Sequence, residues 1–132
     1  MRFDQLEVYQ AALQYLAILR PLVLRLRRQD PAMADQLHRA LLSLPCNIAE
    51  GAGEFSPGDK ARFYRYALRS TTETVGLLDS ADVFGLCRED EHRTARDMAM
   101  RIIAMLTRLV ISVRSPERRK RLEERRLQEP YD

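Results

Sequence analysis

LPCNIAEGAGEFSPGDKARFY, residues 44–64, differs from the long amphipathic patterns on both sides of it. Ser56 and Pro57 form a helix-start signal, because a serine side chain caps free backbone N–H groups and proline fits the first helical position. Gly51 and Gly53 lie just before that signal and allow a turn in which two backbones approach closely. The segment therefore predicts a helical hairpin, with one helix ending at about residue 53 and the next beginning at about residue 57.

The residues before this turn predict one helix over about 31–53. Asp30 and Pro31 repeat the same start signal. An apolar face continues on both sides of Pro45, so this proline lies inside a single helix and does not separate two short ones. That face consists of Leu37, Leu41, Leu44, Ile48 and Ala52.

Three more amphipathic patterns predict the rest of the fold. Asp4 can cap the first helix and form a capping box with Glu7. Gly85 suits the left-handed position that ends many helices, and Ser115 with Pro116 is expected to break or restart the fourth. The expected helices cover about residues 4–28, 57–84 and 89–114.

Four long helices joined by short loops predict an all-α fold, an antiparallel up-and-down four-helix bundle. No segment shows a convincing period-two pattern of a strand. We expect residues 1–114 to form this bundle. Residues 115–132 are expected to form a charged C-terminal extension that is helical or disordered.

The composition is that of a folded helical protein. Of 132 residues, 45% are hydrophobic and 31% are charged. No apolar run reaches the length of about 20 residues that crosses a bilayer, and the N-terminus lacks the apolar core of a signal peptide, so we expect a cytoplasmic protein. The net charge of +3 is too small to establish nucleic-acid binding by itself.

Enzyme signatures are largely missing from the sequence. His38 and His92 share no metal-ligand spacing with each other or with Cys46 and Cys87, which we expect to be free thiols. The glycines of the hairpin follow no strand and precede no Gly-Lys-Ser/Thr, so they do not form a phosphate-binding loop of the nucleotide-hydrolase type. We therefore predict a protein without catalytic residues, a bound metal or a cofactor.

Asn47 and Glu50 are the unusual residues of the hairpin. They lie three positions apart beside the apolar face of their helix, where a buried polar group costs free energy unless it finds a partner. We expect a structural polar clasp in which Glu50 pairs with Lys60, Arg62 or the Tyr64 hydroxyl and Asn47 bonds across to the next helix. The alternative is that the same residues form a ligand or partner site.

Two arginine stripes are the other candidates. Arg62, Arg65 and Arg69 follow one face of the third helix, and Arg101 and Arg108 are seven residues apart on the fourth. Such stripes suit a solvated face or salt bridges between subunits. They also suit a phosphate-binding surface that forms only when several subunits align, because arginine contacts phosphate in a bidentate manner.

Three segments carry a family resemblance. They are FDQLEVYQAAL at residues 3–13, QLHRALLSLPCNIAEGAGEFSPGDKARFYRYALRSTTET at residues 36–74, and LLDSADVFGLC at residues 77–87. The most specific part is the run from Ser43 to Gly53, with Asn-Ile-Ala-Glu-Gly at its centre. Through these segments the chain resembles the four-helix-bundle proteins encoded in intervening sequences of bacterial 23S rRNA genes.

The resemblance implies an antiparallel four-helix bundle that assembles as a ring-like homopentamer, and it implies no catalytic activity. Distant relatives include the accessory protein of diversity-generating retroelements, which works beside a reverse transcriptase and binds nucleic acid. The chain departs from the family pattern at Glu54, where many members have a basic residue, and at Arg69, where many have glycine. Glu54 removes positive charge from the hairpin tip, and Arg69 is expected to point outward or into a subunit contact.

Together these patterns favour a non-enzymatic, homo-oligomeric protein that serves as an RNA or ribonucleoprotein accessory factor through assembled basic stripes. Its expected partners are further copies of itself, a pentamer by the resemblance, and RNA or a nucleic-acid-processing protein. No membrane partner is expected. The alternative is a protein–protein interaction scaffold with no nucleic-acid role, in which the arginines form ion pairs between subunits.

Overall fold

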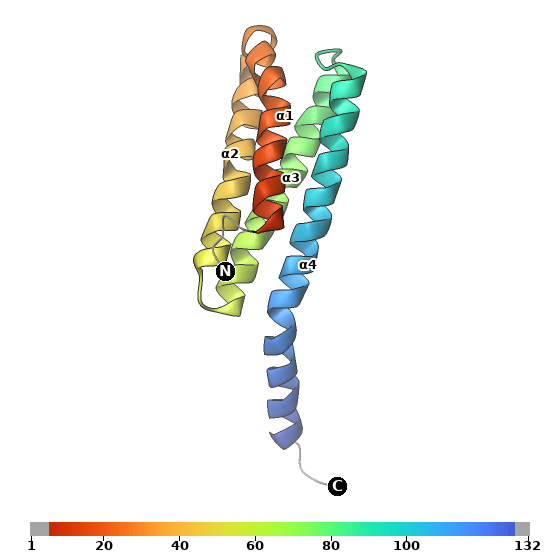
Figure 1. Ribbon diagram of the computed structural model, residues 1–132. Coiled ribbons are helices and arrows are strands. Elements are labelled where there is room, and N and C mark those ends of the chain that lie inside the picture. Colours follow the sequence, from red (N-terminus) through yellow and green to blue (C-terminus); the bar gives the residue numbers. More distant parts are fainter. Residues whose placement is uncertain (1–5, 129–132) are drawn as a thin grey trace.

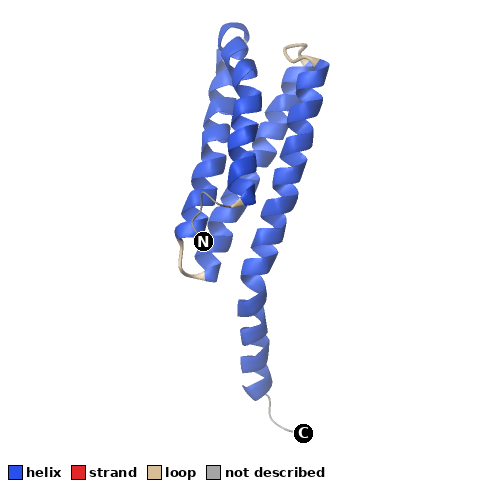
Figure 2. Cartoon of the chain, in the orientation of Figure 1, coloured by secondary structure: helices blue, strands red, loops and turns tan. Residues whose placement is uncertain are grey.

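The computed structural model describes residues 6–128, except for the side chains of residues 115–119 and 122. Within this part of the chain every regular element is a helix, which confirms the predicted all-α fold (Figure 2). Successive helices run in opposite directions, so the bundle is of the up-and-down type (Figure 1). The helices are α1 (Glu7–Gln29), α2 (Pro31–Gly53), α3 (Pro57–Val83) and α4 (Glu89–Gln128).

Two of the predicted helix starts are present as hydrogen bonds. The backbone N–H of Met33 donates to Asp30 Oδ1 over 3.1 Å at the start of α2. The backbone N–H of Asp59 donates to Ser56 Oγ over 3.1 Å at the start of α3. Each bond satisfies a backbone donor that has no partner inside its helix. The capping box expected from Asp4 lies outside the described residues.

Three of the predicted helix ends agree with the structure to within one residue, and the end of α4 does not. Gly85 follows α3 with a positive φ of 72°, a left-handed conformation that glycine adopts without strain. By contrast, α4 does not end near residue 114 but continues as one helix to Gln128, and it projects past the other three (Figure 1). The expected break at Pro116 is therefore wrong. A proline removes one backbone hydrogen bond, and a helix can continue on both sides of it, as α1 does at Pro21.

Each helix packs against two neighbours. Both α1 and α3 pack closely against α2 and α4, whereas α1 lies diagonally across the bundle from α3, as α2 does from α4, with no close backbone approach within either diagonal pair in the described chain. The α2–α3 side and the α1–α4 side therefore lie opposite each other. The largest fully buried side chains are Tyr15, Leu19, Leu22, Leu26, Leu37, Leu44, Ile48, Leu78, Ile102 and Leu106, with Thr71 and Thr74.

One buried polar contact crosses this core. The Tyr15 hydroxyl of α1 and the Thr74 hydroxyl of α3 are 2.8 Å apart. Thr74 also donates to the backbone carbonyl of Thr71 over 2.6 Å. Burial raises the pKa of Tyr15, so the phenol stays neutral and keeps its proton for this contact.

Close packing of the α2–α3 hairpin explains the glycine at residue 51. A Cβ added to Gly51 would lie 2.8 Å from Tyr64 Cε1 and 3.2 Å from Phe63 Cβ. A methyl group has no room at these distances, so only glycine allows the second turn of α3 to lie this close to the last turn of α2. This contact sets the spacing of the two helices at the hairpin.

Candidate functional site

The polar contacts of the hairpin gather around Ser43. Its hydroxyl and that of Ser70 are 2.8 Å apart, which joins α2 to α3. Asn47 Nδ2 donates to the Ser43 carbonyl over 2.8 Å and to Ser43 Oγ over 2.9 Å. Ser70 Oγ also contacts the Tyr66 carbonyl at 3.1 Å. The expected bond from Asn47 to the next helix is therefore wrong, because both of its hydrogen bonds go to Ser43 of its own helix and Ser43 makes the bond to α3.

The expected role of Glu50 in a clasp is wrong. Its side chain is exposed, and it has no hydrogen bond or ion pair within residues 6–128. Lys60, its expected partner, instead donates to the backbone carbonyls of Gly51 over 3.3 Å and Ala52 over 3.0 Å. These carbonyls at the end of α2 lack partners within the helix and carry the negative end of its dipole, so they attract the ammonium group.

Tyr64 contributes packing to the hairpin and not a polar contact with Glu50. Its side chain is buried, with its ring against Gly51. Burial raises the pKa of the Tyr64 hydroxyl, which remains a neutral phenol at physiological pH. The predicted trio of Asn47, Glu50 and Tyr64 therefore divides into a polar contact, an exposed carboxylate and a packing residue.

A polar hollow of about 280 Å³ opens between α2 and α3 beside the Ser43 contact. It is lined by Ser43, Asn47, Tyr66, Arg69, Ser70 and Glu73. The hollow brings Asn47 of the distinctive hairpin run together with Arg69 of the first arginine stripe. The sequence patterns indicated both residues as candidates but did not predict that they line the same hollow.

The arginines of the two stripes are all exposed. Arg62 lies 3.3 Å from Asp59, and its guanidinium carbon is 5.1 Å from the ring centroid of Phe63. The other four have no ion pair with an acidic side chain in the described part of the chain. They are Arg65, Arg69, Arg101 and Arg108.

The two stripes face different sides of the bundle. Arg69 lines the hollow between α2 and α3. Arg108 lines a mainly apolar hollow of about 270 Å³ on the α1–α4 side, together with Leu6, Met105 and Leu109. Since these sides are opposite, one chain does not bring both stripes onto one continuous surface.

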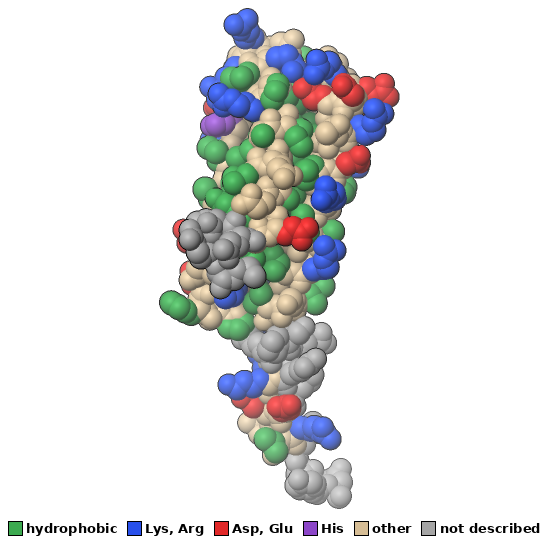
Figure 3. Space-filling model, viewed as in Figure 1, with side chains coloured by type: hydrophobic (Ala, Val, Ile, Leu, Met, Phe, Trp, Pro, Cys, Tyr) green, Lys and Arg blue, Asp and Glu red, His purple; other side chains and the backbone are tan. Residues whose placement is uncertain are grey.

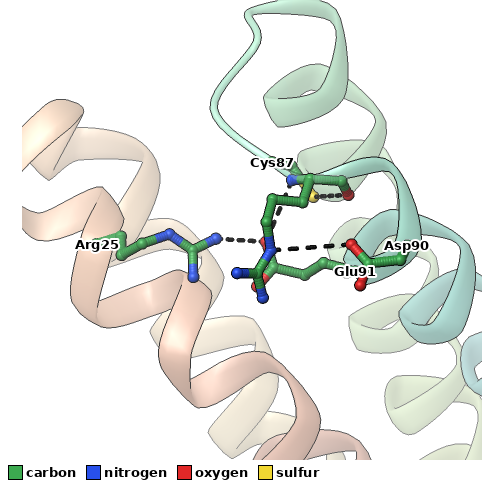
Figure 4. Close-up of polar contacts among 5 residues, drawn as sticks. Arg25, Cys87, Asp90 and Glu91 are labelled. Carbon is green, nitrogen blue, oxygen red and sulfur yellow. Dashed lines mark hydrogen bonds and ion pairs between the residues drawn. The ribbon is translucent and has the colours of Figure 1, made fainter.

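A cluster around Glu91 is the clearest feature that the sequence did not predict. Arg25 of α1 pairs with Glu91 of α4, and the backbone N–H of Arg88 donates to the same carboxylate over 3.4 Å (Figure 4). The Arg88 guanidinium lies 4.0 Å from Glu91 and 3.8 Å from Asp90. The acidic first turn of α4 suits the positive end of the helix dipole, and only the fold brings Arg25 to it.

Electrostatics keep this cluster ionised and its neighbouring thiol inert. Burial by itself would raise the pKa of Glu91, but hydrogen bonds from Arg25 and the Arg88 backbone, with the Arg25 charge, hold it below the usual range. Burial and the nearby Glu91 charge raise the pKa of Cys87 to about 11. The cluster therefore ties α1 to α4, and Cys87 is a poor nucleophile.

A second ion pair joins α3 to α4. Asp79 Oδ1 lies 2.7 Å from His92 Nε2 and 3.3 Å from Arg96 Nε. The hydrogen bond from His92 lowers the pKa of Asp79, and the Arg96 charge acts in the same direction. His92 and Arg96 lie 13 and 17 positions from Asp79 along the chain, so no local sequence pattern indicates this contact.

The described residues contain no group of three or more histidine, cysteine or acidic side chains that would hold a metal ion. Both Cys46 and Cys87 are free. No helix in residues 6–128 combines the length and the apolar character that a membrane crossing requires. The sites that the structure offers are therefore the polar hollow, the arginine stripes and the two ion-pair clusters.

Comparison with known proteins assigns the chain to a family. A search of curated proteins found no match. The family model described as 23S rRNA-intervening sequence protein matches residues 4–108, which include α1, α2, α3 and half of α4. The chain belongs to the 23S rRNA-intervening sequence protein family.

Proposed function

We propose that this protein is a non-enzymatic, homo-oligomeric helical bundle of the cytoplasm that binds RNA phosphates as an RNA or ribonucleoprotein accessory factor. The observation that carries the proposal is the set of exposed arginines without acidic partners, Arg65, Arg69, Arg101 and Arg108. The charge of an unpaired guanidinium is not compensated by a neighbouring carboxylate and its planar fork of donors is free, both of which suit a phosphate group.

The assembly that we propose is a pentamer. Leu24 and Leu42 are large apolar side chains exposed to 48% and 47% on the α1–α2 side. They border a hollow between those helices that Leu16, Val23 and Leu41 also line. Figure 3 shows hydrophobic side chains spread over the face that α1 and its neighbours present. A second copy that covers this side would remove apolar surface from water.

Oligomerisation would also bring arginines of several subunits to one RNA segment, although the two stripes of a single chain face opposite sides. Because the α2–α3 and α1–α4 sides are opposite, a single chain offers only part of the arginines to one RNA segment. A head-to-tail interface that closes into a ring repeats each stripe once per subunit. The positive charge available to an RNA backbone then increases with the number of subunits.

Two measurements test this proposal. Light scattering at micromolar concentration should give a mass several times the 15.4 kDa of the chain, and a monomer mass would refute the assembly. Fluorescence anisotropy with a labelled structured RNA should show an affinity that falls steeply between about 50 and 200 mM salt. An affinity that does not fall over this range would refute phosphate recognition.

A protein–protein scaffold is the second candidate, and the exposed leucines of the α1–α2 side favour it. In that case the arginines would form ion pairs between subunits. Substituting Arg65 and Arg101 together by glutamine would then lower the mass measured by light scattering. On the phosphate-binding account the same variant keeps its mass and loses affinity for RNA.

A further inference from the structure

The hollow between α2 and α3 presents two opposite charges that do not neutralise each other. Arg69 and Glu73 are four residues apart on α3, a spacing at which such side chains commonly pair. Neither forms an ion pair in the described chain, although both line the hollow. A guanidinium and a carboxylate are therefore both available to one bound molecule.

Asn47 adds a hydrogen-bond acceptor in a fixed position. Its Nδ2 donates to the carbonyl and the hydroxyl of Ser43, which leaves Oδ1 to accept from a ligand. Ser43 is itself held by Ser70, whose side chain is buried. The amide is thus oriented before any ligand arrives, which reduces the entropy lost on binding.

Tyr66 adds an aromatic surface. Its side chain is 40% exposed. The ring meets that of Phe63 edge to face, with centroids 5.8 Å apart and planes at 89°. This contact restrains the ring while part of its surface remains open to solvent. A planar group that enters the hollow can stack on that surface.

These groups together favour one ligand chemistry. Inorganic phosphate would be attracted by Arg69 but repelled by Glu73. A cation would be attracted by Glu73 but repelled by Arg69. A nucleotide carries an anionic phosphate for the arginine and a planar base for the tyrosine. The volume of about 280 Å³ is just below the range of about 300–1,000 Å³ that holds drug-sized ligands, which suits a single base.

We infer that this hollow binds one unstacked guanine nucleotide of an RNA strand. The guanine base stacks on Tyr66 and donates its adjacent N1–H and N2–H groups to the Glu73 carboxylate. Asn47 Oδ1 accepts the second N2–H, and Arg69 contacts the phosphate. Adenine, cytosine and uracil do not offer two adjacent N–H donors on this edge, so the carboxylate selects guanine. The inference rests on the proposed RNA binding and names the nucleotide that the protein recognises.

Nucleotide titrations followed by NMR test this base selection. In the ¹⁵N-labelled full-length protein, guanosine 5′-monophosphate should shift the side-chain amide of Asn47 and the backbone amide of Ser70. Inosine 5′-monophosphate, which lacks the N2 amino group, should bind about tenfold more weakly, because Glu73 and Asn47 then each lose a hydrogen-bond donor. Equal shifts with adenosine or uridine monophosphate would overturn the inference.

Glu73→Gln is the decisive variant. The Glu73 side chain is exposed and has no partner in the described chain, so the substitution should leave the fold intact. It should weaken guanosine monophosphate binding about tenfold, because a bidentate charge-assisted contact is lost. Asp97→Asn removes one exposed acidic charge from α4 and is the matched control, with unchanged binding expected. Unchanged binding in Glu73→Gln would also overturn the inference.

Failure of this inference can be distinguished from failure of the proposed function. Glu73→Gln should keep the salt-dependent affinity for structured RNA and lose only the preference for an unpaired guanine over an unpaired adenine. If RNA binds with a steep salt dependence but wild-type protein shows no such preference, the guanine site is refuted and phosphate binding stands. If guanosine monophosphate shifts the hollow but RNA does not bind, the site stands and the RNA function is refuted.

Discussion

The hydroxyl groups of Ser43 and Ser70 lie 2.8 Å apart and join α2 to α3 in the middle of the hairpin. Asn47, the polar residue at the centre of the most distinctive sequence run, is oriented by the same serine. This contact therefore has two consequences: it contributes to the packing of the hairpin, and it fixes one wall of the polar hollow.

Ser43→Ala should lower the free energy of unfolding by about 1–2 kcal/mol, because Ser70 and Asn47 each lose a partner. Glu50→Gln, on an exposed side chain of the same helix, should change it by less than about 0.5 kcal/mol. Urea denaturation followed by circular dichroism measures both. Equal losses in the two variants would contradict this assignment of the contact.

Gly51→Ala should destabilise the protein by about 1–3 kcal/mol, since the new methyl group overlaps the Tyr64 ring at 2.8 Å. Gly53→Ala is the matched control. No atom lies within 4 Å of a Cβ at Gly53, and that residue is the last of α2, so its substitution should be neutral or slightly stabilising. Thermal unfolding compares the two variants, and a Gly51→Ala protein as stable as wild type would refute the close approach.

The Glu91 cluster should make stability depend on pH in the acid range. The pKa of Glu91 is lower in the folded chain than its usual value, so the unfolded state takes up a proton more readily. The contribution to stability is therefore complete above the ordinary glutamate pKa of about 4.3 and is lost as the pH falls through the lower folded value. Arg25→Gln should reduce this acid-range slope in a plot of Tm against pH. The same slope in wild type and variant would show that the pair does not cause it.

The two cysteines should differ in reactivity. Cys46 is exposed, whereas burial and the Glu91 charge raise the pKa of Cys87 to about 11 and leave almost no thiolate near neutral pH. Iodoacetamide in mild excess should alkylate Cys46 first, as read by mass spectrometry of the digested protein. Cys46→Ser should then react only slowly in the native state and fully in urea, and rapid native alkylation of that variant would contradict the inert environment of Cys87.

The sequence predicts those parts of the fold that depend on neighbouring residues. Asp30 with Pro31 and Ser56 with Pro57 each determine a helix start locally, so both starts agree with the structure. The end of α4 is a different case. A proline weakens a helix but does not determine whether the helix ends there. The expected break at Pro116 was therefore wrong.

The candidate site was predicted only in part, because its contacts join distant residues. Asn47 and Arg69 were each predicted as candidate site residues from the pattern of their own helix. That both line one hollow depends on the rotation of α2 against α3, which the sequence does not show. A helical wheel places Glu50 near the core edge but does not show that it faces solvent. The pairing of Arg25 with Glu91 has no local signal, since 66 positions separate the two residues.

The central claim is that unpaired arginines of the bundle bind RNA phosphate. Its most direct test is the slope of log affinity against log salt for a structured RNA, measured on wild type and on Arg65→Gln. Each phosphate contact contributes about 0.7–0.9 to the magnitude of that slope, the lower value for single strands. The account predicts a smaller slope in Arg65→Gln, by at least about one contact, with an unchanged oligomer mass. A wild-type slope close to zero, or an identical slope in the variant, would contradict it.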